Sequence, residues 1–295
     1  MNPQLLNTEP TSRNLSVDLA GSSHRGHVRE QNEDHYLIIQ FGRSLETLGT
    51  NLDQYMLQQS FDVTGYGMLI ADGMGGMAGG EVASSLALSK LVQLVLDTPD
   101  WFLSLKRWED AAKVLNRMKE RFLEIDQAVR QHAEEDMTLR GMGTTLTVAA
   151  TVESDLILGH VGDSRAYLLR DGELVQLTDD HTLAQALIQA GITSPEDLTS
   201  RSMRHVLTSA VGALGESTPQ VLRTRLRPGD RILLCTDGLT DMVDDETIAT
   251  VLQQAQSAHG ACHDLVDLAL AEGGTDNITV IVARFRSANP TEGTD

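Results

Sequence analysis

The stretch 68–80 constrains the fold of this chain more than any other. A run of four apolar residues starting at Met68 ends abruptly in the pair Asp72-Gly73, and four more glycines follow within the stretch. The apolar run predicts a buried strand, and the glycines predict a tight turn where the backbone closely approaches another group. An Asp side chain and an unobstructed Gly carbonyl at a strand end offer oxygen ligands to a hard cation.

Two other interpretations of this stretch are open. Residues 73–78 fit the pattern G-x-G-x-x-[GA] after a strand, which is the fingerprint of dinucleotide-binding folds. That motif is weak alone, and no clear βαβ repeat surrounds it. The second interpretation is an ordinary turn with a solvated Asp. The other segments of the chain must decide between these interpretations.

Length and charge narrow the class of protein. The 295 residues allow one large domain or two small ones, and they can bury a substantial core. A formal net charge of −19 argues against nucleic acid or an anionic membrane as the main partner. Cys235 and Cys262 make neither a disulfide framework nor a zinc site, and Cys235 is expected to be a small buried hydrophobe. We find no signal peptide, membrane-length apolar run or basic targeting segment, so a cytoplasmic location is expected.

Apolar periodicity and capping signals predict several helices. Strong helix formers follow the glycine turn, and a second set of apolar residues recurs every three or four positions, as expected for a helix that packs on a sheet. Gly191 is expected to stop a short helix, and Asp244 is expected to cap a later one. His181 is expected to act as a cap or hydrogen-bonding support rather than in the chemistry. The predicted helices cover residues 81–96, 108–132, 182–190, 245 to about 256, and about 262–271.

The strands are expected to pair as consecutive hairpins. Asp171-Gly172 separates two apolar runs and fits a type I′ turn. Consecutive hairpins produce an antiparallel sheet, which argues against the dinucleotide-binding interpretation. Residues 41–64 are expected to be an irregular insertion between two strands. The whole pattern predicts one domain of mixed helices and antiparallel strands, with a flexible tail at 1–13 and a disordered tail at 287–295.

Five aspartates lie where predicted strands meet polar or glycine-rich loops. If they share one rim of a sheet, their mutual repulsion destabilises the fold unless cations bind. Oxygen ligands without thiolates favour Mg²⁺ or Mn²⁺ over zinc, and two such ions can hold a bridging water as hydroxide. Arg29 lies close by and suits a phosphate clamp, because its planar fork binds an oxyanion through two hydrogen bonds; a surface ion pair is the alternative. The five are Asp34, Asp72, Asp163, Asp237 and Asp276.

Seven short motifs occur in the order found in one enzyme family. Each motif is weak alone, but seven in order are highly specific, and together they span roughly residues 20–286. The chain resembles the metal-dependent serine/threonine protein phosphatases of type 2C, and it is most similar to their bacterial branch. The motifs are R-x-x-N-E-D from Arg29, A-D-G-M-G-G from Ala71, G-M-G-T-T from Gly141, V-G-D-S-R from Val161, L-T-D-D-H from Leu177, C-T-D-G-L from Cys235 and G-T-D-N-I-T from Gly274.

The resemblance implies an α+β fold, a four-layer αββα sandwich of two antiparallel sheets flanked by helices. It implies a phosphatase domain at 14–286 with a variable flap at about 182–222. The implied reaction is hydrolysis of phosphoserine and phosphothreonine by attack of a metal-bridging water. The implied partners are phosphorylated proteins, which include a Ser/Thr kinase or its substrates, and the chain is expected to be a monomer without nucleic-acid or membrane partners. The alternative is a catalytically silent binding or regulatory module with the same fold.

The resemblance also assigns metal ligands position by position. Asp72 corresponds to the residue that bridges two tightly bound Mn²⁺ or Mg²⁺ ions, and the Gly73 carbonyl completes the shell of one ion. Asp237 and Asp276 correspond to ligands of the first ion. Asp163, together with Asp237, corresponds to a third and weaker site that bacterial relatives have.

Other roles follow in the same way. Arg29 corresponds to the phosphate-binding arginine. Asp34 and Glu33 correspond to residues that act mainly through metal-bound waters, and Asn277 is expected to support the ligands from outside the ligand set. Some relatives have a His after the Asp-Gly pair as general acid, but Met74 stands there and cannot donate a proton, so metal-bound water is the expected substitute. Segments 41–64 and 97–110 are longer than a minimal member needs.

Overall fold

A computed structural model describes residues 15–46, 60–75, 79–97, 111–194, 203, 205–213, 215 and 217–287. Two five-stranded sheets form its centre. The first contains, in spatial order, β1 (Leu15–His24), β12 (Ile278–Ser287), β11 (Arg231–Cys235), β8 (Arg165–Arg170) and β9 (Glu173–Gln176). The second contains β10 (Gln220–Arg225), β7 (Asp155–Val161), β6 (Leu146–Val152), β3 (Ser60–Ala71) and β2 (His35–Glu46). A small extra pair joins β4 (Gly73–Met74) to β5 (Gly143–Thr144).

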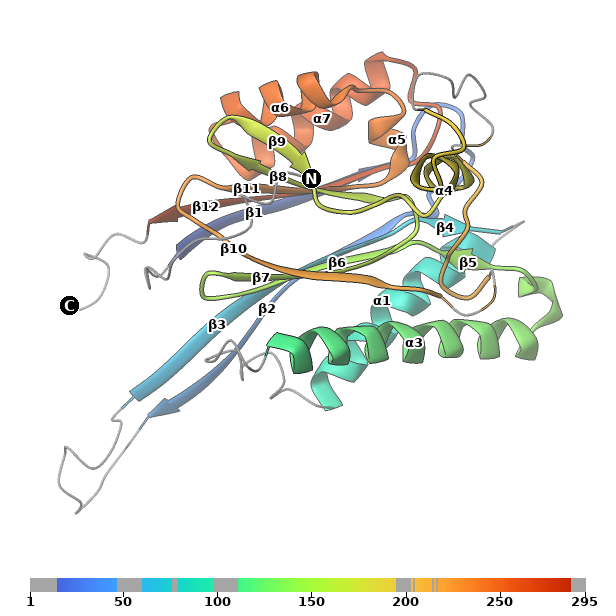
Figure 1. The fold of residues 1–295 in the computed structure, drawn as a ribbon, viewed down its shortest axis with the longest axis horizontal. Coiled ribbons are helices and arrows are strands. Elements are labelled where there is room, and N and C mark those ends of the chain that lie inside the picture. The colour runs from blue at the N-terminus through green and yellow to red at the C-terminus, as the bar shows by residue number, and fades with distance from the viewer. Residues whose placement is uncertain are drawn as a thin grey trace.

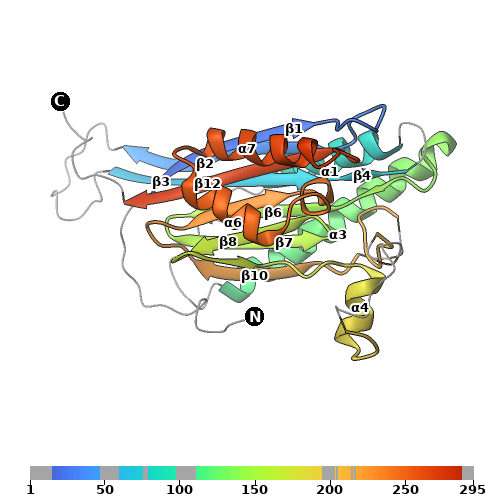
Figure 2. The same ribbon diagram turned by 90° about the horizontal axis from the view of Figure 1, so that it is seen from above.

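Helices cover both outer faces of the two sheets, so the predicted four-layer αββα sandwich is confirmed (Figure 1). The first sheet is covered by α6 (Asp245–Gln254) and α7 (Ala258–Ala271), and the second by α1 (Gly79–Asp97) and α3 (Ala111–Glu135). Short helices α4 (Leu183–Gln189), α5 (Asp237–Thr240) and η4 (Met137–Leu139) lie in the connections. Seen from above, α4 projects from the body of the sandwich (Figure 2).

Alternation along the central strands builds three hydrophobic layers. In β11, Ile232 and Leu234 face the other sheet, whereas Leu233 and Cys235 face α6 and α7. Successive side chains point to opposite faces of a strand, so one apolar run supplies both layers. Cys235 is a fully buried free thiol, as the sequence predicted.

The strand register brings the predicted acids to one end of the sandwich. His35 pairs with Ala71, so Asp34 at the start of β2 lies beside Asp72 at the end of β3. Cys235 pairs with Val280, which places the end of β11 beside the start of β12. Antiparallel neighbours begin and end at the same rim, and this rim therefore collects acids that are far apart in the sequence.

Pairings within the described ranges are all antiparallel. A dinucleotide-binding βαβ unit needs parallel strands, so that interpretation is wrong. The predicted hairpin across Asp171-Gly172 is confirmed, because both residues have positive φ, 52° and 87°, as a type I′ turn requires.

Several predicted boundaries were wrong. β2 continues to Glu46 and pairs with β3 from Ser60, so much of the supposed irregular insertion 41–64 is a long hairpin, and 47–59 lie outside the described residues. β1 was not predicted, and β10 takes up residues 220–222 of the predicted flap range. Asp237 is the first residue of α5 rather than a strand residue.

Helix boundaries differ by smaller amounts. α7 begins at Ala258, four residues earlier than predicted, because the Ser257 hydroxyl accepts a hydrogen bond from the Gly260 amide as an N-cap. Asp244 caps α6 as predicted, accepting from the Thr247 amide. The tail at 1–13, most of segment 97–110, and the C-terminal tail beyond Ser287 lie outside the described residues. Within the described ranges, no helix combines the length and apolar character needed to cross a membrane.

Candidate metal and phosphate site

A cavity of about 650 Å³ opens at the rim where the acidic loops meet. Seven predicted site residues besides Arg29 line it, and they come from five separate segments of the chain. Asp34 lies behind this wall, only 5% exposed. The predicted residues in the lining are Glu33, Asp72, Gly73, Asp163, Asp237, Asp276, Asn277 and, at the mouth, Arg29.

Asp34 is held from inside the protein. Its Oδ2 accepts hydrogen bonds from the hydroxyls of Thr236 at 2.9 Å and Thr279 at 2.7 Å. Burial raises the pKa of this carboxyl to about 7, and the negative charges of Asp237 and Asp276 act in the same direction against the two hydroxyls. Asp34 is therefore a fixed carboxyl whose charged form a nearby cation would stabilise.

Burial and neighbouring negative charges also raise the pKa values of Asp72 and Asp163. Burial is the largest cause that raises the pKa of Asp72 well above its usual value, followed by the charges of Asp34 and Asp237. Burial likewise raises the pKa of Asp163, and Asp237 adds to the shift. Three carboxyls with raised pKa values at this rim, two in the cavity and Asp34 behind its wall, indicate that the fold concentrates negative charge here.

The donor set fits hard divalent cations. In the described part of the chain, Asp34 Oδ1 and Asp237 Oδ1 are buried oxygens without a hydrogen-bond partner. A buried carboxylate oxygen without a donor is costly unless a cation binds it. The cavity offers several carboxylates, which are the ligands that Mg²⁺ and Mn²⁺ prefer, and its lining contains no cysteine.

Gly73 lies where three backbone segments meet. A Cβ atom at this position would lie 2.1 Å from the Gly80 carbonyl oxygen and 2.7 Å from that of Glu33. Its neighbour Asp72 is fixed by the Thr145 amide, which donates to the Asp72 carbonyl at 2.9 Å. Only glycine allows the strand end, the first turn of α1 and the Glu33 loop to come this close, which agrees with the predicted close approach.

Arg29 stands at the mouth of the cavity. Its Nη2 donates to Asp276 Oδ2 at 2.6 Å, and its side chain is 53% exposed. The hydrogen bond to Asp276 is the largest cause that raises the pKa of Arg29. The ion pair that was the alternative interpretation is present, and it joins the predicted clamp to a predicted metal ligand.

Asn277 organises the loop that carries Arg29 and Glu33. Its Oδ1 accepts from the Glu33 amide at 2.8 Å, and its Nδ2 donates to the carbonyls of Arg25 and Gln31, each at 2.9 Å. Burial raises the pKa of Glu33. Asn277 therefore connects β12 to the first loop without itself adding charge.

His181 performs a supporting role, as predicted. Its Nδ1 accepts from the Gly162 amide at 3.3 Å, and its own amide donates to the Gly162 carbonyl at 2.7 Å. Gly162 has a φ of 114° and directly precedes Asp163. These contacts hold the loop that presents the Asp163 carboxylate.

His205 and Asp241 also line the cavity and were not predicted. His205 Nδ1 lies 3.9 Å from Asp237 Oδ2, and its Nε2 lies 3.6 Å from Asp241 Oδ2. The nearby Asp237 carboxylate is the largest cause that raises the pKa of His205, and the negative charge of Asp241 acts in the same direction. His205 follows a polar stretch without periodicity, so the sequence carries no local signal for its position.

The fold and this acidic, metal-fitting rim define a class of metal-dependent hydrolases, and the comparisons with known proteins give the family. A profile described as Protein phosphatase 2C matches residues 42–271. The chain belongs to the protein phosphatase 2C family, in which metal dependence is general.

Two curated relatives illustrate the similarity. PstP of Mycobacterium tuberculosis is named a serine/threonine protein phosphatase and is 43% identical over 216 residues, which cover 73% of this chain and 40% of PstP. The chain thus matches less than half of that relative's length. The serine/threonine phosphatase stp of Listeria welshimeri is 31% identical over 264 residues, covering 88% of this chain and 92% of stp.

Solved structures show the same fold. The catalytic domain of PstP, solved in complex with two manganese ions, has a TM-score of 0.70 and 36% identity, covering 92% of this chain and 99% of that one. The serine/threonine phosphatase of S. agalactiae has a TM-score of 0.72 and 28% identity, with 92% and 99% coverage. The αββα architecture is therefore shared with known phosphatases.

Proposed function

We propose that this chain is a metal-dependent protein phosphatase that hydrolyses phosphoserine and phosphothreonine in proteins. The observation that carries the proposal is the meeting of Arg29 with four of the five aspartates in one cavity, with the fifth, Asp34, buried behind its wall. They come from segments spread over residues 29–276. Antiparallel pairing places Asp34 beside Asp72, and it places the end of β11, next to Asp237, beside the start of β12, next to Asp276. Family membership and the named relatives support the same reaction.

In this proposal, four residues hold the metal centre. Asp72 would be a ligand of two Mn²⁺ or Mg²⁺ ions, the Gly73 carbonyl would be a ligand of one of them, and Asp237 and Asp276 would hold the first ion. Such ions supply a nucleophilic water at neutral pH and neutralise the attacked phosphate. The raised pKa values of the neighbouring carboxyls support this assignment, because cations would stabilise their charged forms.

The remaining residues position the ligands and the substrate. Asp34 and Glu33 orient water in the cavity, and Asn277 fixes their loop. The Arg29 guanidinium leaves Asp276 and binds two phosphoryl oxygens of the substrate as a planar fork. Met74 offers no proton to the leaving alkoxide, so in this proposal solvent in the cavity supplies it.

A third, weaker ion is assigned to Asp163 with Asp237. The negative charge of Asp237 helps to raise the pKa of Asp163, and this repulsion between the two carboxylates supports the assignment. The proposed phosphatase domain covers 14–286, and its flap runs from 182 to the start of β10. The proposed partners are phosphorylated proteins, including a Ser/Thr kinase or its substrates, and the proposed state is a monomer.

Release of inorganic phosphate tests the proposal directly. The substrates are p-nitrophenyl phosphate and a phosphothreonine peptide, each with Mn²⁺, Mg²⁺ or excess chelator. We expect turnover of both substrates with either metal and none with chelator. A folded protein that binds metal but releases no phosphate would instead support the silent binding module.

A further inference from the structure

An arginine without an acidic partner lies at the end of the sandwich opposite the metal site. Arg231 is the first residue of β11, and Asp237 of the metal site lies just beyond the other end of that strand. The five residues of β11 separate the two positions by about 15 Å. Figure 1 shows β12, the neighbour of β11, ending on the side of the sandwich away from α4 and α5. A ligand of Arg231 would therefore lie outside the proposed catalytic cavity.

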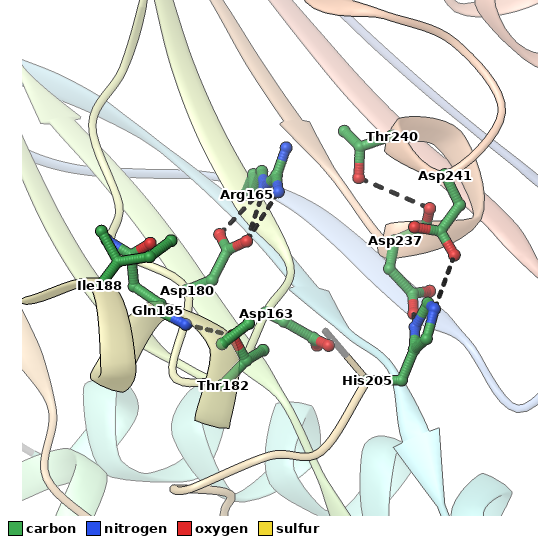
Figure 3. Close-up of a pocket in the computed structure, with 11 residues that line it drawn as sticks. Asp163, Arg165, Asp180, Thr182, Gln185, Ile188, His205, Asp237, Thr240 and Asp241 are labelled. Carbon is green, nitrogen blue, oxygen red and sulfur yellow. Dashed lines mark hydrogen bonds and ion pairs between the residues drawn. The ribbon is translucent and has the colours of Figure 1, made fainter. Parts of the chain in front are cut away.

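Other arginines in this part of the fold and near the metal site are paired with acids. Asp and Glu outnumber Lys and Arg by 42 to 23, so acids are plentiful enough to pair with every arginine. In a second cavity of about 260 Å³ beside the metal site, Arg165 donates to both carboxylate oxygens of Asp180 (Figure 3). On β8, Arg170 likewise donates to both oxygens of Asp230. The Arg231 guanidinium, in contrast, has no hydrogen bond or ion pair with any residue that the structure describes, and its Nη1 is buried.

Two further arginines share one face of the sheet with Arg231, and we call the three residues the distal arginines. Arg284 of β12 is the cross-strand partner of Arg231, and Arg286 follows two positions later. Arg231 precedes Leu233 by two positions, so the three side chains are on the face that α6 and α7 cover. Like charges directly opposite each other in a sheet are destabilising. Burial, and then the positive charges of Arg284 and Arg286, lower the pKa of Arg231. The fold therefore gathers positive charge around this guanidinium.

In the described ranges, the acid that pairs with the distal arginines is Asp18, and it already has several partners. Its Oδ2 accepts from Arg284 Nη1 at 3.2 Å and from the Ala258 amide at 2.9 Å. The same oxygen lies 3.9 Å from Arg286 Nη2. Three guanidinium groups and one carboxylate leave a surplus of two positive charges. Arg286 is 57% exposed and Arg231 is half-buried, so an anion from solvent has access to both.

We propose that the distal arginines bind a phosphoryl group that is not being hydrolysed, on a second phosphorylated residue of the substrate protein. The inference deepens the proposed function and rests on it, because it selects multiply phosphorylated proteins as the substrate class. A phosphorylated side chain carries a charge of about −1.5 to −2 at pH 7, which matches the surplus of two positive charges, whereas a carboxylate would balance only one. Each planar guanidinium can donate two parallel hydrogen bonds to phosphate oxygens.

Binding in chelator isolates this site, because the metal-free catalytic cavity is acidic and repels phosphate. The probe is a peptide with one phosphothreonine and no other charged side chain, titrated into the whole chain at low ionic strength and followed by calorimetry. Arg231→Gln should weaken binding by at least about tenfold, as expected when a hydrogen bond to a charged group is lost. Arg29→Ala should keep it. Arg117→Gln is the matched control, since that arginine is 46% exposed on α3, which covers the other sheet.

Two results of these titrations would overturn the proposal. The first is unchanged binding in Arg231→Gln. The second is equal binding of the same peptide with Glu in place of phosphothreonine, since the site would then be one for acidic peptides in general. We expect the Glu peptide to bind at least about tenfold more weakly, because a carboxylate has half the charge and fewer acceptor oxygens.

Turnover with Mn²⁺ identifies the source of the phosphoryl group. The substrate is a peptide with two phosphothreonines joined by about 20 Gly- and Ser-rich residues, whose mean span is about 25 Å. Because its two ends can bind together, its KM should be at least about tenfold lower than that of the singly phosphorylated peptide. Arg231→Gln should remove this difference and leave the kinetics with p-nitrophenyl phosphate unchanged. Equal KM values for the two peptides would overturn the docking of a substrate, and displacement of the peptide by orthophosphate in chelator would then assign the site to free phosphate.

Thermal unfolding in chelator shows whether Arg231 is only structural. Arg231→Gln should keep or raise Tm without ligand, since it removes a charge that repels Arg284. A lower Tm with unchanged peptide binding would make Arg231 a structural residue and overturn the proposal. Failure of the proposed function is distinct from these results, because it appears as no turnover of any phosphopeptide at saturating Mn²⁺, whereas binding in chelator does not depend on turnover.

Discussion

The Arg29 guanidinium donates a 2.6 Å hydrogen bond to the Asp276 carboxylate, across 247 positions of sequence. The residue proposed to bind phosphate is thus paired with a residue proposed to bind metal. A cation bound to Asp276 would compete with Arg29 for the same carboxylate oxygens and weaken the hydrogen bond between the two residues. Metal binding would therefore free the guanidinium at the mouth of the cavity, where a phosphoryl group enters.

Arg29→Ala should lower kcat/KM for a phosphothreonine peptide by about 10- to 100-fold, since hydrogen bonds to charged groups contribute about 1.5–3 kcal/mol. KM should rise because the phosphate loses two donors. Arg29→Lys should recover only part of the loss, because an ammonium keeps the charge but lacks the planar fork. Steady-state kinetics at saturating Mn²⁺ measure both variants.

Arg25 supplies the control for this experiment. It lies in the same loop, and its side chain donates to the Glu30 carbonyl rather than to the acids. Arg25→Ala should keep near-normal kinetics, because the Asn277 contact uses the Arg25 backbone carbonyl. Equal losses in both variants would mean that Arg29 acts through the shape of the loop and not through phosphate binding.

Asp237→Asn should affect activity and stability in opposite directions. Turnover should fall by at least about a hundredfold, because a bound metal supplies several kcal/mol of transition-state stabilisation. The metal-free protein should become more stable, because one of several mutually repelling acids is neutralised. Phosphate release and thermal unfolding in chelator measure the two effects.

Asp264→Asn is the matched control for this variant, since Asp264 is 61% exposed on α7. It should change neither turnover nor the stability of the metal-free protein beyond about 0.5 kcal/mol. Full activity in Asp237→Asn would contradict the assignment of this residue to the metal centre.

The acids of the site could be predicted because each lies at a local boundary that the sequence displays. Asp72, Asp163 and Asp237 each follow an apolar run, and each has glycine as a neighbour. To predict that these strand ends lie at one rim of the sheets, it was enough to assume that the strands pair in antiparallel order. The resemblance of seven ordered motifs then added the roles, which no local pattern could supply.

Other parts of the site and fold depend on contacts that sequence patterns do not encode. β1 is polar and half-buried, so its alternation is weak, and its strand state comes from pairing with β12. β10 similarly depends on β7. His205 reaches the site only because the flap segment pairs with residues 181–183. Tertiary contacts determine these placements and override the local strand propensity of the sequence.

The metal-free protein should lose stability as pH rises from 6 to 8.5. Burial raises the pKa of Asp34 to about 7 and that of Asp163 to about 8, whereas an unfolded Asp titrates near 3.9. A raised folded-state pKa stabilises the fold fully below the unfolded value, and this stabilisation is lost as pH rises through the folded value. Tm in chelator should therefore fall by several degrees over this range, at about 2–4 °C per kcal/mol.

Manganese should reverse this dependence, because ions bind the deprotonated carboxylates and binding releases protons. Asp34→Asn should flatten the curve in chelator, and Asp264→Asn should leave it unchanged. Scanning calorimetry at constant ionic strength gives both curves. A Tm in chelator that rises across this range would show that the acids are already charge-balanced by the protein.

Asn277→Ala should weaken metal binding although Asn277 need not touch a metal. The variant removes three hydrogen bonds and leaves the Glu33 amide and two carbonyls without their partner. The loop of Arg29 and Glu33 would then shift against β12. Loss of partners that orient ligands typically costs about 10- to 100-fold in metal affinity, and an unpaired buried group costs about 1–3 kcal/mol of stability.

Calorimetric Mn²⁺ titration and denaturant unfolding separate these two effects for Asn277→Ala. Asn277→Asp keeps the acceptor for the Glu33 amide but loses both donated bonds, so it should fall between the unmodified protein and alanine in stability. Gln253→Ala is the control, because it removes one exposed side-chain bond to the Gly172 carbonyl, remote from the site. If Asn277→Ala loses stability while its Mn²⁺ affinity stays normal, the Asn277 hydrogen bonds do not position the metal ligands, and Glu33 and Arg29 are positioned by other contacts.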